Sequence, residues 1–361
     1  MKFSRTAKGF VLVVAAATML VSCSSLNYYA QAAQGQLTLL SDARPIEEWL
    51  ADQNTNAKLR TRLATARQIR TFAVQELALP DNNSYKNYAS LARPFVLWNV
   101  VATPELSLKP IQWCFPVAGC VSYRGYYSKD DAASYGRELR AEGNDVQVGG
   151  VPAYSTLGWF NDPLISTFIY YPDAELARLL FHELSHQVVY VQDDSQFNES
   201  FASAVEEAGV ERWLSGYGNQ ALRDNYISFS ARKKEFLKLL LNCRSALEQN
   251  YASKGSRADK RAAKARLFQK LKDDYQVLKV SWGGFAGYDR FFAEPLSNAH
   301  LASIATYNDF IPAFRALLAR EKTFPRFFAA ARVLGELDKA ERHKQLKRLA
   351  ASLPVVAVAQ Q

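Results

Sequence analysis

The chain has 361 residues, of which 48% are hydrophobic and 12% aromatic, so it can bury a sizeable core and should be folded over most of its length. Its 44 Lys and Arg residues exceed its 35 Asp and Glu residues by nine, but they cluster at 232–272 and 339–348 among acidic and apolar residues at helical spacing. This pattern is typical of solvated helix faces, which argues against a nucleic-acid partner and leaves contact with anionic envelope surfaces as the alternative.

Residues 1–22 have the pattern of an export signal. A basic start is followed by an apolar stretch at residues 9–21, too short to span a bilayer comfortably, and then by Cys23. The pattern resembles the signal of bacterial lipoproteins, which implies that Cys23 becomes the first mature residue and is lipidated. A lipid on Cys23 would anchor the protein without a membrane-spanning segment. We expect a lipid-anchored protein of the bacterial cell envelope, at the outer membrane facing the periplasm, with an ordinary secretory signal as the alternative.

The mature chain is expected to form one unit with two lobes, because no linker rich in Pro, Gly or Ser divides it. Leu59, Leu63 and Ala66 recur at helical spacing until Pro80 ends the pattern. A stretch rich in Val, Tyr, Phe, Trp and Thr then predicts short strands, with one helix near residues 131–141. The order predicts an α+β fold that is predominantly helical, with a small mixed sheet before the long helical part. Its regions are N-terminal helical, β-rich, helical and tail, at residues 23–92, 93–172, 173–351 and 352–361.

Cys114 and Cys120 enclose a short loop in the β-rich part. In an exported chain, two cysteines so close together predict a disulfide, with pairing of either one to Cys243 as the alternative. The cysteines are too few to build a metal site of their own.

The most informative motif is His182-Glu183-Leu184-Ser185-His186. Two histidines four residues apart lie on one face of a helix, where their imidazoles can converge on one metal ion. A carboxylate from a second helix would complete a His₂Glu set with an open fourth position, which is typical of catalytic zinc. Glu183 lies about 100° around the helix from His182, so it is placed to take a proton from a water molecule that zinc activates. The helix is expected to start with Asp173 as its N-cap, and a histidine pair on a polar seam between helices is the alternative to a metal site.

A second motif, Asn198-Glu199-Ser200-Phe201-Ala202, follows shortly after the first. Together the two motifs resemble the paired signature of the gluzincin aminopeptidases, which implies a zincin-like metallopeptidase fold and one Zn²⁺ ion held by His182, His186 and Glu199. Glu206 lies seven residues after Glu199 and therefore on the same helix face, where it is either a rival ligand or a residue that orients an imidazole. The Gly-x-Met-Glu-Asn segment with which the large aminopeptidases hold a free amine is absent.

Further stretches extend the resemblance over most of the mature chain. Residues 113–120, 123–126 and 153–160 are similar to a family of bacterial zinc aminopeptidases, which implies a metallopeptidase. The segment 148–168, which contains the last stretch, is also the candidate for substrate binding, because a strand beside the metal helix could pair with a peptide backbone. A buried core strand is the alternative. The candidate edge residues are Tyr154, Ser155, Thr156 and Gly158.

Peptide hydrolysis needs a hydrogen-bond donor for the oxyanion besides the metal, usually Tyr or His. Tyr307 and His300 fall on one helix face if residues 299–310 are helical, which makes both candidates. His343 lies in a basic amphipathic stretch and is expected to be a surface residue. The competing donor candidates are Tyr154, Tyr275 and Tyr288.

The leading hypothesis from the sequence is zinc-dependent hydrolysis of peptide bonds in the cell envelope, by an aminopeptidase that acts on peptides. One alternative from the same class is an endopeptidase or a hydrolase of peptidoglycan stem peptides. An alternative from another class is a lipoprotein without catalysis, which binds envelope proteins and keeps the metal for stability. The expected partners are a peptide substrate and a membrane, reached through the lipid anchor, and the sequence leaves the oligomeric state open.

Overall fold

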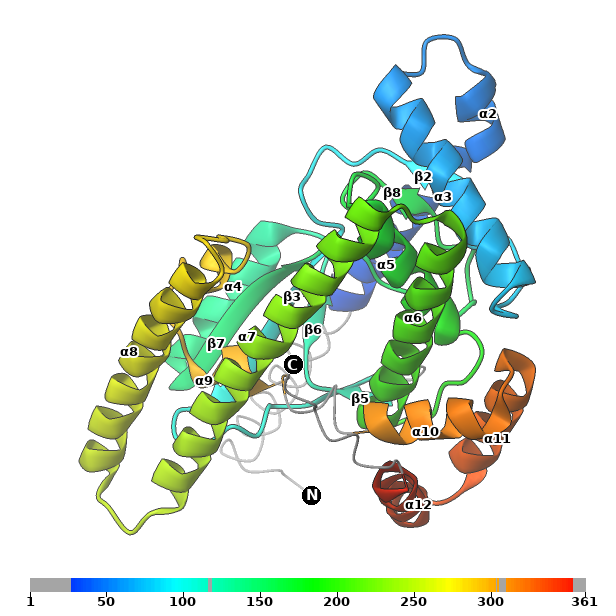
Figure 1. Ribbon diagram of the computed structural model, residues 1–361. Coiled ribbons are helices and arrows are strands. Elements are labelled where there is room, and N and C mark those ends of the chain that lie inside the picture. The colour runs from blue at the N-terminus through cyan, green and yellow to red at the C-terminus, as the bar shows by residue number, and fades with distance from the viewer. Residues whose placement is uncertain (1–26, 116–118, 303, 305–309, 353–361) are drawn as a thin grey trace, which may run out of the picture.

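The computed structural model describes residues 27–115, 119–302, 304 and 310–352. The predicted signal peptide, Cys23 and Tyr307 lie outside the described residues. As predicted, the fold is α+β and mostly helical, with the strands in the first half of the chain and long helices in the second (Figure 1). Among the helices of the described part, none combines the length and the apolar character that crossing a membrane requires.

The N-terminal part is helical. Residues 27–41 form a first helix, which is followed by β1 (Arg44–Pro45), α2 (Ile46–Ala51) and α3 (Ala57–Gln75). Asn56 caps α3 by accepting a hydrogen bond from the backbone N–H of Lys58. The polar Arg70 can be buried on this helix because its guanidinium donates to backbone carbonyl groups beyond the helix end, at Pro80, Asn82 and Ser84.

The largest sheet is antiparallel and centres on β3 (Leu97–Pro104), which lies between β6 (Arg124–Tyr126) and β7 (Asn144–Val151). Alternate residues of β3, Trp98, Val100 and Ala102, are buried, as expected for a strand with one face on a core. α4 (Lys129–Ala141) packs on this face and closes a small core.

Two smaller sheets accompany it. β2 (Asn87–Ala89) pairs antiparallel with β1 and parallel with β8 (Leu164–Ile165), so this sheet is mixed. β4 (Trp113–Phe115) and β5 (Gly119–Val121) form a separate hairpin.

The predicted edge strand at residues 154–158 is wrong. These residues form a loop after β7, because Leu157 and Gly158 adopt left-handed backbone angles, with φ of +57° and +83°, which an extended strand cannot contain. Asp162 closes the loop, since its carboxylate accepts hydrogen bonds from the backbone N–H and the hydroxyl of Thr156 at 2.9 and 2.8 Å. A buried core strand, the alternative, is also absent from this segment.

Helices make up most of the rest. α5 (Asp173–Ser185) and α6 (Ser195–Tyr217) pack against each other and against α3, and they share the largest core of the described residues. α7 (Gln220–Ala252) and α8 (Arg257–Ser281) form a long antiparallel pair with a core of its own (Figure 1). The remaining helices are the 3-10 helix Asp289–Phe292 (η1), α9 (Asn298–Ala302), α10 (Ile311–Glu321), α11 (Phe324–Glu336) and α12 (Lys339–Ala351).

The C-terminal helices are tied to the start of α6 by Asp194. Its fully buried carboxylate accepts hydrogen bonds from the backbone N–H of Phe197, which caps α6, and from Nε of Arg342 at 2.9 Å. His343 Nε2 lies 2.9 Å from the same carboxylate, and its ring packs on Phe310. His343 is therefore partly exposed, as expected of a surface residue, but it has a buried partner that the sequence did not predict, because Asp194 lies far away in the chain.

Replacement of Asp194 by Ala should lower the free energy of unfolding by about 3–5 kcal/mol, because it leaves the buried Arg342 guanidinium without its counter-charge. The control is Asp338→Ala. Asp338 is the N-cap of α12, and its loss should cost only about 1 kcal/mol. Urea unfolding of both variants measures the difference, and equal losses would contradict the assigned role of Asp194.

Candidate metal centre

α5 carries His182 and Glu183 and ends with His186 as its C-cap. Arg62 of α3 holds the other end of this helix, because its guanidinium binds the Asp173 carboxylate and the carbonyl groups of Ile169 and Tyr171. Asp173 is thus the first residue of α5 and an ion-pair partner, while Pro172 is the N-cap, so the prediction of Asp173 as N-cap is wrong. The helix is buried through Leu176, Leu180 and Leu184.

α6 brings Glu199 to α5, and the packing groups along α6 explain how. Gly209 permits a close approach, since a Cβ atom there would lie 2.8 Å from a ring carbon of Phe181. Phe201 is fully buried and packs on Phe314 and Phe327. These contacts fix the rotation of α6, so that Glu199 faces the histidines.

Asn198 holds the short connection between the two helices. Its side-chain amide accepts a hydrogen bond from the backbone N–H of Val191 and donates one to the carbonyl group of Val191, both at 2.8 Å. This double contact closes residues 187–194 into a compact loop. The Asn of the second motif is therefore used to position Glu199 rather than to bind a ligand.

His182, His186 and Glu199 offer ligand atoms that all lie within 4.8 Å of one another. The Nε2 atoms of the two histidines are 3.2 Å apart, and the Glu199 carboxylate oxygens lie 3.3 Å from Nε2 of His182 and 3.8 Å from Nε2 of His186. Tetrahedral zinc with bonds of about 2.0–2.1 Å places its ligands about 3.3 Å apart. The spacing and the donor types therefore fit a His₂Glu zinc site with an open fourth position.

The two histidines differ in charge. Burial lowers the pKa of His186 to about 4, so its imidazole is neutral and can donate a lone pair at neutral pH. Burial also acts to lower the pKa of His182, but the Glu199 and Glu206 carboxylates outweigh it and raise this pKa to about 10. A divalent cation bound among the three residues would replace the proton on His182.

Glu206 contacts the Nδ1 atom of His182, whereas the Nε2 atom of the same ring faces Glu199. Its carboxylate is 2.9 Å from Nδ1 of His182 and accepts a hydrogen bond from Arg178 at 3.0 Å, with Lys233 of α7 at 3.9 Å. Burial acts to raise the pKa of Glu206, but Arg178 and His182 outweigh it and lower this pKa to about 2. The geometry thus gives Glu206 the place of a residue that orients an imidazole, and not that of a rival ligand.

We call His182, His186 and Glu199 the metal group. Glu183 follows His182 directly on α5 but is not one of these three residues. Burial raises the pKa of Glu183 to about 7, and the neighbouring Glu199 adds to the effect. A divalent cation at the site would lower this pKa again. A carboxyl group that titrates near neutral pH is suited to take up and release a proton.

The polar side chains among the predicted substrate-binding residues form hydrogen bonds with other side chains of the protein. The Tyr154 hydroxyl contacts Gln36 and the hydroxyl of Tyr127, and Ser155 and Thr156 donate to Asp162. Gly158 nevertheless lies beside the metal helix, since a Cβ atom there would be 3.8 Å from the side chain of Gln187, directly after His186. The loop is near the site, and substrate binding by these residues stays a prediction.

The structure does not bring the other predicted oxyanion donors to the metal group. His300 is buried against Phe291, and its Nδ1 accepts a hydrogen bond from the backbone N–H of Ser297. Tyr275 donates to Asp289 at 2.6 Å, and Tyr288 stacks on Phe236. These residues belong to the separate core of α7 and α8, which sequence spacing alone does not place.

Two tyrosines that were not predicted as site residues feel the charge of Glu199. Tyr123 connects β5 with β6 and is 40% exposed, and burial together with the Glu199 and Glu183 charges raises the pKa of its hydroxyl. Tyr190 lies in the loop between α5 and α6, where burial and Glu199 raise its pKa. The only sequence signal for Tyr123 is its place in the stretch 123–126, which the resemblance includes without a role.

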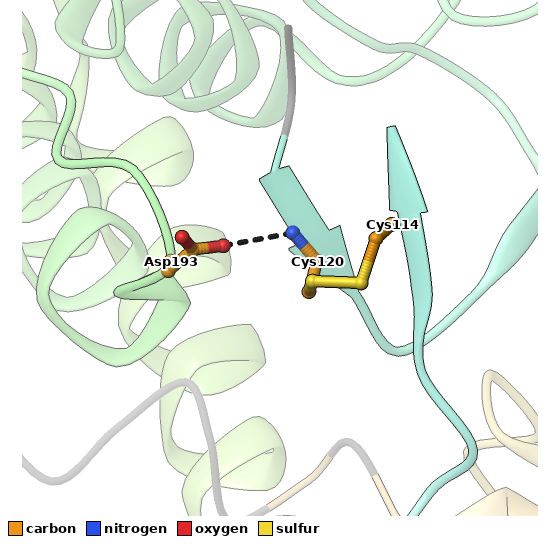
Figure 2. The surroundings of a disulfide bond; sticks show 3 residues. All are labelled: Cys114, Cys120 and Asp193. Atoms are coloured by element: carbon orange, nitrogen blue, oxygen red, sulfur yellow. Dashed lines mark hydrogen bonds between the residues drawn. A yellow bond between two sulfur atoms is a disulfide. The ribbon is translucent and has the colours of Figure 1, made fainter. Parts of the chain in front are cut away.

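A disulfide-closed hairpin positions Tyr123. Cys114 and Cys120 are bonded across β4 and β5, and the backbone N–H of Cys120 donates to the Asp193 carboxylate at 2.8 Å (Figure 2). Gly119 permits this contact, since its φ is +72° and a Cβ atom there would lie 2.4 Å from the Asp193 carboxylate. The alternative pairing does not occur, because Cys243 is a free, buried thiol.

Glu206→Gln should weaken zinc binding about 10- to 100-fold, because His182 loses the carboxylate that orients it. The matched control is Glu207→Gln, which removes a neighbouring, partly buried carboxylate paired with Arg315 and leaves the metal group untouched. Competition with a zinc chelator measures the affinities, and circular dichroism checks the folding of both variants. An equal loss of affinity in the two variants would contradict the role of Glu206.

The comparisons with known proteins agree with this site. Residues 27–346 match the model of a protein family described as "Putative aminopeptidase". No curated protein and no solved structure matches the chain. Since the match covers nearly the whole described chain, including both helices of the metal centre, this protein belongs to that aminopeptidase family.

Proposed function

We propose that this protein is a zinc-dependent peptidase. The observation that carries the proposal is the spacing of His182, His186 and Glu199, whose ligand atoms lie where a tetrahedral zinc ion needs them. A structural zinc site uses four protein ligands, whereas the group among the described residues has three. The family description supports peptide hydrolysis as the reaction.

Bound zinc would polarise the carbonyl group of the substrate and make water more acidic. Glu183 takes a proton from the attacking water on its carboxylate and delivers it to the leaving nitrogen as the C–N bond breaks. A carboxylate suits both steps because it must accept and release a proton in each turnover, and burial, which raises the pKa of Glu183, opposes the effect of a bound cation. Glu206 keeps the His182 ring in place throughout.

Tyr123 is the proposed donor to the oxyanion that develops on the substrate carbonyl. Its side chain is 40% exposed, the charges of Glu199 and Glu183 act on it, and among the described residues its hydroxyl has no hydrogen-bond partner to compete with a substrate. Burial and these carboxylates keep the hydroxyl protonated, which a donor requires. Tyr154, which was a candidate, has its hydroxyl engaged with Tyr127 and Gln36.

The proposal also includes the type of peptidase and its location: an aminopeptidase that is anchored in the cell envelope. The family description supports removal of N-terminal residues. The N-terminal sequence, with its apolar stretch followed by Cys23, supports export and lipid anchoring. Purified protein loaded with zinc should therefore cleave peptides with a free amine faster than the same peptides with an acetylated amine.

Glu183→Gln should lower kcat on free-amine peptides about 10²–10⁴-fold while zinc content is retained, because the amide cannot accept the proton. Peptide cleavage followed by mass spectrometry, with zinc measured in the same samples, provides the test. Unchanged activity would refute the role of Glu183 as the proton acceptor. The absence of turnover in the zinc-loaded native protein would refute the proposal that the protein is a peptidase. Equal cleavage of acetylated peptides would indicate an endopeptidase.

Tyr123→Phe should lower kcat about 10²–10³-fold with little change in KM, since the lost hydrogen bond forms in the transition state. Tyr190→Phe is the control, because it removes a second hydroxyl near Glu199 from another segment. Steady-state kinetics of both variants with one free-amine peptide decides between them. A larger effect from Tyr190→Phe would move the donor role to that residue.

A further inference from the structure

The loop 153–162 exposes two large aromatic side chains beside the metal centre. Trp159 is 69% exposed and Phe160 is 46% exposed, at the tip of the loop. Exposed aromatic residues that are held next to a candidate active site are surfaces to which an apolar group can bind.

The loop is held rigidly. The backbone N–H of Trp159 donates to the carbonyl group of Thr156 at 3.0 Å, and the backbone N–H of Phe160 donates to the Thr156 hydroxyl at 3.1 Å. The buried Asp162 carboxylate accepts two further hydrogen bonds from Thr156. These hydrogen bonds hold the turn around Thr156 and leave both aromatic rings exposed, so their exposure follows from the conformation of the loop.

Two contacts, one at the end of the loop and one next to its tip, place it beside the end of α5. The carbonyl group of Asp162 accepts a hydrogen bond from the backbone N–H of Tyr85 at 2.6 Å, and Gly158 packs on Gln187, which directly follows His186. Gln187 is fixed in turn, because its side chain accepts a hydrogen bond from Asn82 at 2.6 Å and donates one to Ser84 at 3.2 Å. Trp159 therefore extends from a fixed base beside the end of the metal helix.

We propose that Trp159 and Phe160 form one wall of a subsite that takes a large apolar side chain of the peptide substrate. This inference rests on the proposed peptidase function and adds a substrate class to it. The aromatic rings offer contact area without a charge, so they favour apolar side chains over small or acidic ones. Residues 153–162 contain no Lys or Arg, and the one charged side chain, Asp162, is buried, so nothing in the loop attracts an acidic residue or an anionic lipid surface.

The test uses Glu183→Gln loaded with zinc, so that binding is measured without turnover. Peptides that differ only in the N-terminal residue, Phe, Leu, Ala or Asp, are titrated calorimetrically. We expect the Phe peptide to bind about 10- to 200-fold more tightly than the Ala peptide. Trp159→Ala in the same background should reduce this ratio at least several-fold. Phe160→Ala should reduce it as well.

Tyr170→Ala is the matched control, because Tyr170 is also an aromatic residue with 46% exposure, but it lies over Lys58 of α3 rather than at this loop. Its replacement should leave the ratio unchanged. An Ala peptide that binds as tightly as the Phe peptide, or a ratio that Trp159→Ala does not change, would overturn the inference. Loss of binding to neutral phospholipid vesicles in Trp159→Ala, with the peptide ratio intact, would overturn it in favour of a membrane contact.

The outcomes separate this inference from the proposed function. Cleavage by the native protein without any preference between the peptides would leave the peptidase standing and refute the subsite. Selective, Trp159-dependent binding without cleavage by the native protein would support the subsite and refute the peptidase.

Discussion

The compact loop between α5 and α6 is the constraint on which the rest of the site depends. Three side chains fix residues 187–194, and two of them bind distant parts of the chain. Asn198 closes the loop through hydrogen bonds with Val191. Asp193 accepts a hydrogen bond from the backbone N–H of Cys120. Asp194 binds Arg342 and His343. The loop therefore couples the two metal-bearing helices, the disulfide hairpin and the C-terminal helices in one place. Because ligand atoms must be held within a few tenths of an ångström to bind zinc well, so dense a set of anchors is what the chemistry requires.

Burial of the carboxylates near the metal group costs free energy, and neighbouring positive charges offset this cost. This balance explains how the side chains are arranged. Several carboxylates gather within a poorly solvated space, which is costly unless cations accompany them. Arg178 and Lys233 offset the charge of Glu206, and His182 lies between Glu206 and Glu199. A bound divalent cation would complete this compensation. The same surroundings separate the two acids by role, since Glu206 is kept ionised while Glu183 titrates near neutral pH.

Aromatic residues surround the metal group on the outside. Tyr123 and Tyr190 lie near Glu199, and Trp159 and Phe160 project from a loop that is fastened beside Gln187. They come from three segments that are far apart in the sequence, and each segment is tied to α5 or to the loop after it. In the proposed peptidase, this arrangement would combine charge for the reaction with apolar surface for the substrate.

The sequence by itself determined the local features of this protein. Helical spacing predicted the metal helix, the change of period predicted strands before it, and the short spacing of Cys114 and Cys120 predicted their bond, because such features depend on neighbours in the chain. The tertiary structure alone decided which distant groups meet. It placed Glu206 on the outer nitrogen of His182, kept His300 in a separate contact with Ser297, and paired His343 with Asp194. Spacing in a sequence fixes the face of a helix, whereas the partner of that face depends on how the whole core packs.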